Sequence, residues 1–436
     1  MTPLSNNGVF LALALALCAG CDGSADVFGS DASTDADTDT DVDTDADTDT
    51  DTDTDTEAPP IWPPYEPTPS WTSLDPGYAT GAAFADIDGD GEHDLVVANG
   101  NDMLEGPILV YYADGAGGLP TTASWESDEI AYHGKLAAGD VDGDGLVDVV
   151  AAVYLGDAGF DEPGGVVYYR NDGGELPAVP TWRTSVAFYC FGVALGDIDG
   201  DGDLDLAAAT GESYYHDPEP DRLFRNEAGA FVEPAAWTSA VSRHSMDVAF
   251  LDADDDGWSD LAFASIGAPH AIYLNEGAGT GLPGLTPSVD MPGASFEGNT
   301  LAAGDINGDG AVDLVISDND QQGGPGTVRA YCGPSFETCW ESADTPTYQS
   351  AVALRDLDGD GDLDLAAGSW WGPIRFYRND LSDGDDAPFE DTPSAVTDTE
   401  TVVETIVFHD VNGDGKDDLL ATDWTPDHGN DLYFHR

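Results

Sequence analysis

The chain has 436 residues, with 12 Lys and Arg against 86 Asp and Glu, so its formal net charge is −74. A surface this acidic excludes a general nucleic-acid-binding role, because phosphate backbones are bound by basic surfaces. The length allows a large core. Thirteen of the acids lie in residues 31–57, and many of the others fall in short loops that recur along the chain.

The N-terminus, residues 1–20, has the features of an export signal. Val9 to Cys18 is an apolar run of ten residues, shorter than the roughly 20 needed to span a bilayer. The sequence Leu17-Cys18-Ala19-Gly20-Cys21 resembles a bacterial lipobox, which implies lipidation of Cys21. An ordinary secretory signal cleaved near Ala19-Gly20 is the alternative. We therefore expect an exported protein of the bacterial cell envelope, at the outer membrane or cell surface, that contacts membrane only through a lipid anchor.

Residues 21–68 are predicted to be a tether. Asp and Thr alternate from Thr34 to Thr56, and such a stretch has almost no apolar surface to bury, so we expect it to be disordered and extended. A Pro-rich segment from Ala58 onward is predicted to be a stiffer, polyproline-like collar.

A nine-residue acidic loop recurs seven times after the tether. Its first residue is Asp86, Asp140, Asp197, Asp252, Asp305, Asp356 or Asp410. Position 3 holds Asp88, Asp142, Asp199, Asp254, Asn307, Asp358 and Asn412, and position 5 holds Asp90, Asp144, Asp201, Asp256, Asp309, Asp360 and Asp414. Position 9 holds Asp94, Asp148, Asp205, Asp260, Asp313, Asp364 and Asp418. Oxygen ligands at alternate positions, with glycine for the sharp turn, are typical of a Ca²⁺ loop.

Position 7 varies freely, as expected if only its backbone carbonyl binds the metal. It holds Glu92, Leu146, Asp203, Trp258, Ala311, Asp362 and Lys416. We predict about seven Ca²⁺ ions, one for each loop. Asn307 and Asn412 remove a charge, so the fifth and seventh loops should bind more weakly. Asp255 replaces the glycine at position 4 of the fourth loop, where Asp tolerates a left-handed backbone. Acidic surface turns without metal are the alternative interpretation.

The loops are 51 to 57 residues apart, and this period predicts repeated structural units. Each repeat reads as a small-residue strand, the loop, a buried apolar strand, an aromatic strand, and a fourth strand that Trp marks in most repeats. One such fourth strand, around Trp71, precedes the first loop, while the chain ends on a third strand at Leu432 to Arg436. The N-terminal strand is therefore predicted to pair into the last repeat and close a ring.

The loops at 197–206 and 356–365, together with Tyr-Arg-Asn-Asp at 169–172 and 377–380, resemble FG-GAP/VCBS repeats, the family of integrin α-subunit propellers and many bacterial surface proteins. The resemblance covers residues 69–436. It implies an all-β fold, a seven-bladed β-propeller of four-stranded blades, with Ca²⁺ in the turns between the first and second strands. It does not imply one function, because such folds serve many.

Three cysteines follow the predicted lipidation site Cys21. Cys332 and Cys339 flank a predicted turn between two strands, so a local disulfide is plausible in an exported protein. Cys190 is interpreted as a small buried hydrophobe rather than a nucleophile.

No catalytic constellation is present: the chain lacks Gly-x-Ser-x-Gly, His-Glu-x-x-His and a phosphate-binding glycine loop. The leading hypothesis is a monomeric, non-catalytic binding or adhesion module with an extracellular protein or polysaccharide ligand. The alternatives are a polysaccharide lyase or glycosidase on the same ring and a structural surface-coat protein.

A ligand face is predicted at the strand ends opposite the acidic loops. Its candidate residues are aromatic and lie in the connections there: Tyr78, Tyr132, Tyr189, Tyr215, Tyr348, Trp370, Trp371 and Trp424. Exposed aromatics beside carboxylates suit sugar rings or a basic protein segment. Packing of the tyrosines between repeats is the alternative.

Overall fold

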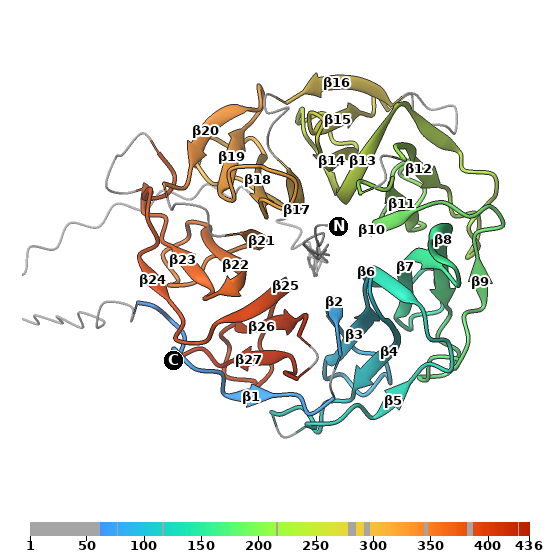
Figure 1. Cartoon of the computed structure of the whole chain (residues 1–436), viewed down its shortest axis with the longest axis horizontal. Helices are drawn as coiled ribbons and strands as arrows, with labels where there is room; N and C mark the ends of the chain where they lie inside the picture. Colours follow the sequence, from blue (N-terminus) through green and yellow to red (C-terminus); the bar gives the residue numbers. More distant parts are fainter. Residues whose placement is uncertain are drawn as a thin grey trace, which may run out of the picture. The chain divides into compact units, whose positions relative to one another are not determined.

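The computed structural model describes residues 62–75, 77–115, 117–214, 217–277, 285–291, 297–343, 348–381, 387–425 and 427–436. The predicted signal, the predicted lipidation site Cys21, most of the predicted tether and Tyr215 lie outside these residues. The described residues contain 27 strands and no α-helix (Figure 1). Accordingly, the described part of the chain holds no helix able to cross a membrane.

Three sheets are four-stranded and antiparallel. The first contains β2 (Ala79–Ala85), β3 (Asp94–Gly100), β4 (Glu105–Tyr111) and β5 (Trp125–Glu126). The second contains β6 (Tyr132–Gly139), β7 (Asp148–Gly156), β8 (Gly159–Tyr169) and β9 (Trp182–Arg183). The third contains β17 (Gly298–Gly304), β18 (Asp313–Asp318), β19 (Val328–Cys332) and β20 (Glu337–Glu341).

The other two sheets are larger. The seven-stranded sheet contains β10 (Cys190–Gly196), β11 (Asp205–Thr210), β12 (Glu219–Phe224), β13 (Trp237–Leu251), β14 (Asp260–Ile266), β15 (Ala271–Leu274) and β16 (Thr286–Asp290). The eight-stranded sheet contains β21 (Gln349–Arg355), β22 (Asp364–Gly372), β23 (Arg375–Tyr377), β24 (Ala395–Val396), β25 (Thr401–His409), β26 (Asp418–Asp423), β27 (Asp431–Tyr433) and β1 (Trp71–Thr72).

The prediction of a seven-bladed propeller of separate four-stranded blades is therefore wrong. The described strands form five hydrogen-bonded sheets, and three of these have four strands. One cause is β13, whose 15 residues pair with β12 at one end and with β14 at the other. The second cause is β22, which extends far enough for Trp370 to pair with Val402 of β25. Both strands continue where the repeat pattern predicted a break.

The strand at the N-terminus pairs as predicted. Trp71 and Thr72 of β1 lie opposite Leu432 and Asp431 of β27. The contacts begin before the predicted domain start at residue 69, because Tyr65 is buried and forms a bridge with His435. The hydroxyl of Tyr65 also donates to the carbonyl of Asp417 at 2.9 Å.

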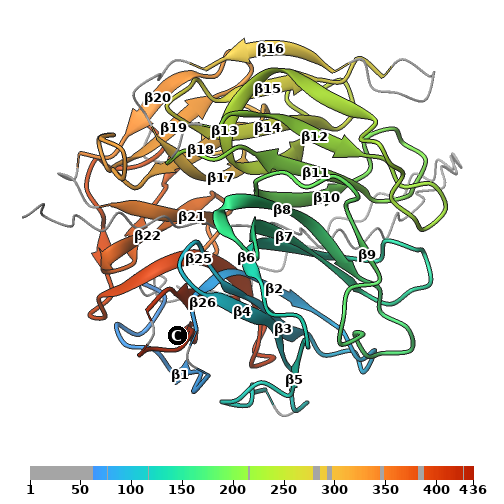
Figure 2. The same cartoon turned by 45° about the vertical axis from the view of Figure 1, so that its right-hand side comes forward.

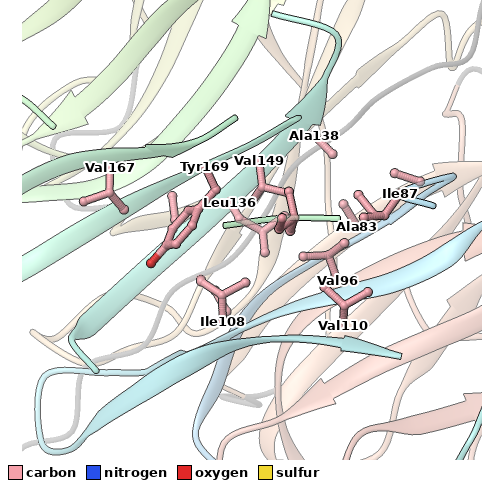
Figure 3. Close-up of a cluster of buried hydrophobic side chains, with 14 of the residues drawn as sticks. Ala83, Ile87, Val96, Ile108, Val110, Leu136, Ala138, Val149, Val167 and Tyr169 are labelled. Atoms are coloured by element: carbon pink, nitrogen blue, oxygen red, sulfur yellow. The ribbon is translucent and has the colours of Figure 1, made fainter. Parts of the chain in front are cut away.

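The first strand of each repeat lies at the centre, and the sheets extend outward from it (Figures 1 and 2). Each central strand contacts the next, and the last contacts the first, in the order β2, β6, β10, β13, β17, β21 and β25. The arrangement is an all-β propeller. Its hydrophobic core is divided among the interfaces between neighbouring repeats. Figure 3 shows one such interface, where Val96 and Ile108 pack against Leu136 and Val149.

Small residues on the central strands allow this close approach. A Cβ on Gly81 would lie 2.9 Å from the backbone nitrogen of Leu136, and a Cβ on Gly134 would lie 2.4 Å from the carbonyl oxygen of Phe191. Both distances are too short for real contacts, so side chains at these positions would force the sheets apart.

Hydrogen bonds join the central strands where each of them has a β-bulge. Thr405 donates to the carbonyl of Thr80 at 3.0 Å, and Thr80 in turn donates to the carbonyl of Gly134 at 2.9 Å. Asn299 donates to the carbonyl of Ser350 at 2.9 Å. A bulge leaves backbone groups outside the ladder, and here those carbonyls bond to the neighbouring sheet.

A buried ion pair spans three central strands at the same level. Lys135 Nζ of β6 lies 2.5 Å from Asp247 Oδ1 of β13, and both side chains are fully buried. Gly192 of β10 lies between them, and a Cβ there would be 3.3 Å from Asp247 Oδ1, so its missing side chain leaves room for the lysine. Asp247 Oδ2 accepts a 2.9 Å hydrogen bond from the amide of Leu301 on β17. Burial lowers the pKa of Lys135 to about 8, against the opposing effect of Asp247.

We predict that Lys135→Met lowers the free energy of unfolding by about 3–5 kcal/mol, because it leaves the buried carboxylate of Asp247 without its cation. Urea unfolding followed by fluorescence measures the effect. The double variant Lys135→Met/Asp247→Asn removes the buried charge as well, so it should be more stable than Lys135→Met alone. Equal stability of the wild type and Lys135→Met would show that the pair does not hold the strands together.

Asparagine side chains link neighbouring repeats at the acidic-loop end of the strands. Asn226, two residues after β12, donates to the carbonyl of Val141 in the preceding loop at 2.6 Å and to that of Leu204 at 3.2 Å. Equivalent bonds run from Asn171 to Ile87, from Asn275 to Ile198 and from Asn379 to Ile306. In the last repeat, His435 Nε2 takes this place beside the carbonyl of Leu357.

Asn226→Ala should lower the free energy of unfolding by about 1–3 kcal/mol, because two buried carbonyls lose their donor. Glu227→Ala is the matched control: the adjacent side chain is exposed, so its removal should change stability by less than about 0.5 kcal/mol. Chemical denaturation of both variants measures the difference. If the two variants unfold at the same denaturant concentration, the asparagine link contributes nothing.

Candidate metal centres and ligand face

The seven acidic loops share one backbone conformation. In every loop the amide of the glycine at position 6 donates to the carboxylate at position 1, with distances of 2.7 to 3.1 Å. The amide at position 7 donates to Oδ1 of the aspartate at position 5. These bonds turn the chain so that carboxylates at alternate positions face one another. Asp255 has a φ of +58°, which confirms the predicted left-handed backbone at that position.

Carboxylates of the acidic loops lie close together. Ligand atoms of three residues lie within 4.8 Å of one another in at least five loops: Asp86, Asp88 and Asp90; Asp140, Asp142 and Asp148; Asp197, Asp199 and Asp205; Asp252, Asp254 and Asp260; Asp356, Asp358 and Asp360. Hard oxygen donors in this arrangement suit Ca²⁺.

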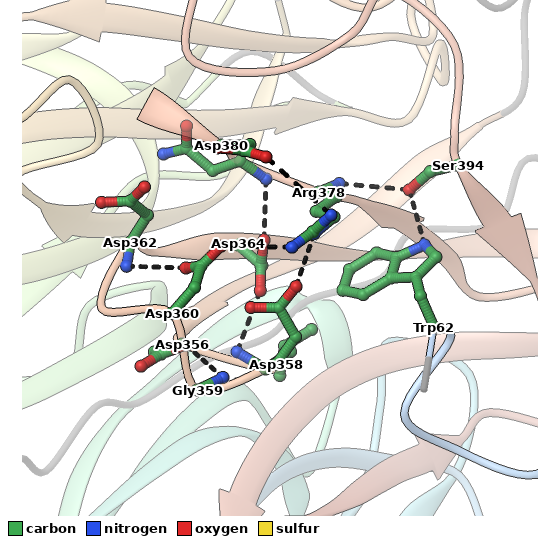
Figure 4. A network of polar contacts seen from close by, with 12 residues as sticks. Trp62, Asp356, Asp358, Gly359, Asp360, Asp362, Asp364, Arg378, Asp380 and Ser394 are labelled. Atoms are coloured by element: carbon green, nitrogen blue, oxygen red, sulfur yellow. Dashed lines mark hydrogen bonds and ion pairs between the residues drawn. The ribbon is translucent and has the colours of Figure 1, made fainter. Parts of the chain in front are cut away.

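The aspartate at position 9 has a structural role in every loop. Figure 4 shows Asp364, whose Oδ2 accepts from the amide of Leu357 at 2.9 Å and whose Oδ1 accepts from the amide of Asn379 at 2.7 Å. The same two bonds recur in the other six repeats, with Ala113, Gly333 or His435 as the second donor in three of them. Burial raises the pKa of Asp364 to about 7. In Asp148 and Asp418 one of these oxygens accepts a further hydrogen bond, from the hydroxyl of Tyr168 and from Asn412 Nδ2 respectively.

Arginines pair with the aspartate at position 3 of three loops, and sequence reasoning assigned them no role. Arg378 Nε lies 2.5 Å from Asp358 Oδ2 (Figure 4). Arg170 pairs with Asp142 at 2.6 Å, and Arg225 pairs with Asp199 at 2.5 Å. The sequence pattern that could have revealed these contacts is the Arg-Asn pair that recurs after the aromatic strand. Its arginine pairs with the acidic loop of the same repeat, and its asparagine bonds to the acidic loop of the preceding repeat.

Two of these arginine-paired aspartates indicate whether the loops suit a metal ion. Asp358 Oδ1 and Asp199 Oδ1 are buried and have no hydrogen-bond partner among the described residues. A buried carboxylate oxygen without a partner is costly unless a cation or water satisfies it. The residues therefore fit a hard cation, which would offset the charge that the loop carboxylates bring together.

The asparagines at position 3 direct amide groups toward neighbouring carboxylates. Asn307 Nδ2 lies 3.1 Å from Asp309 Oδ2, and Asn412 Nδ2 lies 3.3 Å from Asp418 Oδ1. The weaker binding of the fifth and seventh loops stays a prediction.

The two cysteines near β20 are bonded, with Cys332 Sγ 2.04 Å from Cys339 Sγ. The remaining described cysteine, Cys190, is free and buried. Burial raises the pKa of its thiol, which agrees with the interpretation of Cys190 as a core residue.

The opposite face carries a row of aromatic side chains. Tyr78, Trp424, Trp370, Trp371 and Tyr348 are in contact in that order, with ring centroids 5.6 to 6.0 Å apart. Tyr78 and Tyr348 directly precede β2 and β21, Trp424 directly follows β26, and Trp370 and Trp371 lie at the end of β22, next to the connection that follows it. Because each sheet is antiparallel, these connections lie at the strand ends opposite the acidic loops.

The predicted ligand-face residues differ in exposure. Trp370 and Trp424 are 2% and 4% exposed, and Tyr189 is also buried, so these three support the surface and cannot present a face to a ligand. Tyr78 and Tyr132 are half-buried. Trp371 is 56% exposed and Tyr348 is 40% exposed. The accessible part of the row is therefore this last pair.

The two exposed residues have unusual backbones. Trp371 has a φ of +52° and Tyr348 a φ of +50°. Bulky side chains rarely adopt this region, and the strain is of order 1–3 kcal/mol for each residue. The amide of Trp370 donates to the carbonyl of Tyr348 at 2.9 Å, and its indole donates to Glu404 Oε1 at 2.6 Å. These two hydrogen bonds hold Trp371 and Tyr348 against the propeller through Trp370, which lies next to Trp371 in the chain.

Comparison with known proteins agrees with this fold. The FG-GAP-like repeat family model matches four stretches: residues 86–151, 140–208, 252–316 and 356–421. Cartilage acidic protein 1 of Mus musculus is 25% identical over 324 residues, which are 66% of this chain and 48% of that protein. T-cell immunomodulatory protein of Rattus norvegicus is 25% identical over 353 residues, 79% of this chain and 50% of that protein. The chain thus spans about half the length of these relatives.

A solved structure supports the fold alone. BBS1N in a complex with ARL6DN, soaked with lead, has a TM-score of 0.54 at 13% identity and covers 87% of this chain and 97% of that one. The family matches together cover more than half of the present chain. The chain therefore belongs to the FG-GAP-like repeat family.

Proposed function

We propose that the chain is a calcium-stabilised, non-catalytic binding module of an exported protein, and that it holds an extracellular protein or polysaccharide on its aromatic face. The observation that carries the proposal is the exposed pair Trp371 and Tyr348. Strained backbones cluster at functional sites, and exposed aromatic side chains on a rigid scaffold suit the recognition of a partner.

Calcium has a supporting role in this proposal. The acidic loops lie at the strand ends opposite Trp371, so a cation there would act by holding the sheets together and would not touch the ligand. Ca²⁺ bound only by the folded chain stabilises that state by mass action. The loops thus serve the rigidity of the scaffold on which the aromatic residues are fixed.

The finer features of the proposal concern location. Lipidation at Cys21 would anchor the chain to the bacterial cell envelope. The acidic segment 31–57 would then act as a spacer between the membrane and the propeller. In this proposal the protein is a monomer. The similarity to Cartilage acidic protein 1 and T-cell immunomodulatory protein supports a comparable setting outside the cytoplasm.

Trp371→Gly separates binding from stability. Glycine removes the ring and also releases the strain at φ +52°, so the free energy of unfolding should hold or rise. Binding to the ligand recovered from a panel of polysaccharides and extracellular proteins should fall at least tenfold. Surface plasmon resonance measures the affinity, and calorimetry measures the melting temperature.

Glu92→Gln, on the acidic-loop face, is the control and should leave the affinity unchanged. The proposal fails if Trp371→Gly binds as the wild type does while Glu92→Gln abolishes binding. Cleavage of a polysaccharide during the same assay would contradict the non-catalytic part.

A further inference from the structure

Two adjacent pockets lie over the second and third repeats, away from Trp371. The acidic pocket, of about 440 Å³, is lined by Glu105, Asp157, Glu162 and the Glu129–Arg183 pair, among others. The apolar pocket, of about 410 Å³, is lined by Val186, Phe188, Phe224, Pro234 and Ala235, among others. Thr184 and Ser185 line both pockets, so the two form one continuous surface.

The acidic pocket has an uncompensated negative charge. Arg183 is the only basic residue in its lining, and its guanidinium is paired with Glu129. Glu105, Asp157 and Glu162 are exposed and form no ion pair with the described residues. Three carboxylates around one cavity attract a cationic group and repel an anionic one.

The two charged side chains that line the apolar pocket, Arg222 and Glu233, already have partners within the chain. Arg222 lies 4.0 Å from the ring centroid of Phe188 and is paired with Glu219 at 2.8 Å. Glu233 Oε1 accepts from the amide of Ser185 at 2.7 Å. What this pocket offers a partner is therefore apolar area, and Val186 is 66% exposed at its edge.

The edge of β8 adds backbone groups to the acidic pocket. β9 pairs only with Val167 and Tyr168, so the part of β8 from Gly159 to Gly165 has no strand on that edge among the described residues. Gly164 and Gly165 belong to the pocket wall. An extended peptide can hydrogen-bond to such an edge while its side chains enter pockets on either side.

We propose that this two-pocket surface binds an extended segment of a partner protein in which a Lys or Arg side chain lies close to an aliphatic one. The basic group enters the acidic pocket, and the aliphatic group covers Val186 and Phe188. The acidic segment 31–57 and a second copy of this chain are excluded by charge, because the chain has 86 acidic and only 12 basic residues. The inference names a partner class for the module proposed above and rests on that proposal.

The test uses the full-length protein and fluorescently labelled peptides of the form Gly-Leu-(Gly)n-Arg-Gly-Arg-Gly, with one to three glycines between Leu and Arg. Fluorescence anisotropy should show binding that weakens as salt is raised, because the contacts are partly electrostatic. Replacing Arg by Glu in the peptide should abolish binding, and replacing Leu by Gly should weaken it at least fivefold.

The protein variant Glu105→Gln/Glu162→Gln should bind the basic peptide at least tenfold more weakly at an unchanged melting temperature, because both side chains are exposed and form no ion pair with the described residues. The bond that Glu162 accepts from the amide of Ala158 at 3.2 Å can be kept by the amide oxygen of glutamine. Trp371→Gly should bind the peptide as the wild type does. Unchanged affinity in the double glutamine variant, or no binding by any peptide of the set, overturns this inference. Neither result affects the aromatic-face proposal, whose own test uses Trp371→Gly and a different ligand panel.

Discussion

A buried carboxylate at the end of each acidic loop is the interaction on which the rest of the structure depends. Asp364 and its six counterparts accept one amide from the start of their own loop and one from the residues that follow the third strand. Each therefore fixes the loop, the second strand and the third strand to one another. Because the asparagine of the same segment bonds to the preceding loop, one repeat sets the position of the next.

Fixing the acidic loops in this conformation brings their carboxylates close together, and the electrostatic repulsion between them destabilises the fold. A carboxylate at position 9 is buried next to others at positions 1, 3 and 5, and like charges at such distances repel. Arginines offset part of the charge at three loops, at Asp142, Asp199 and Asp358. A divalent cation in each loop would offset more, which explains how a chain with a net charge of −74 can hold so many acids at one end of its strands.

Much of this organisation could be predicted from the sequence, because it repeats. Alternate acids and glycines indicated the loop conformation, including the left-handed Asp255, and the unmatched strand at Trp71 indicated its pairing with β27. The division into sheets could not be predicted. Whether β13 stops or continues depends on hydrogen bonds to two different neighbours, and no local signal records them.

The candidate ligand face shows the same limit. The aromatic residues were identifiable, but their exposure was not, because it depends on contacts between repeats that are distant in sequence. Trp370 and Trp424 are covered by stacking on each other, and Trp371 stays exposed because of its left-handed backbone. The role of Arg378 was hidden for a different reason: its partner Asp358 lies 20 residues away, across the second and third strands.

We propose that the acidic loops gather carboxylates for Ca²⁺ and that the bound ions stabilise the propeller. The most direct measurement is the calcium content of the purified protein by elemental analysis, combined with calorimetry before and after chelation. The account predicts about seven Ca²⁺ ions per chain, one for each loop, and a melting temperature that falls substantially when they are removed. A calcium content near zero, with a melting temperature that chelation does not change, would contradict it.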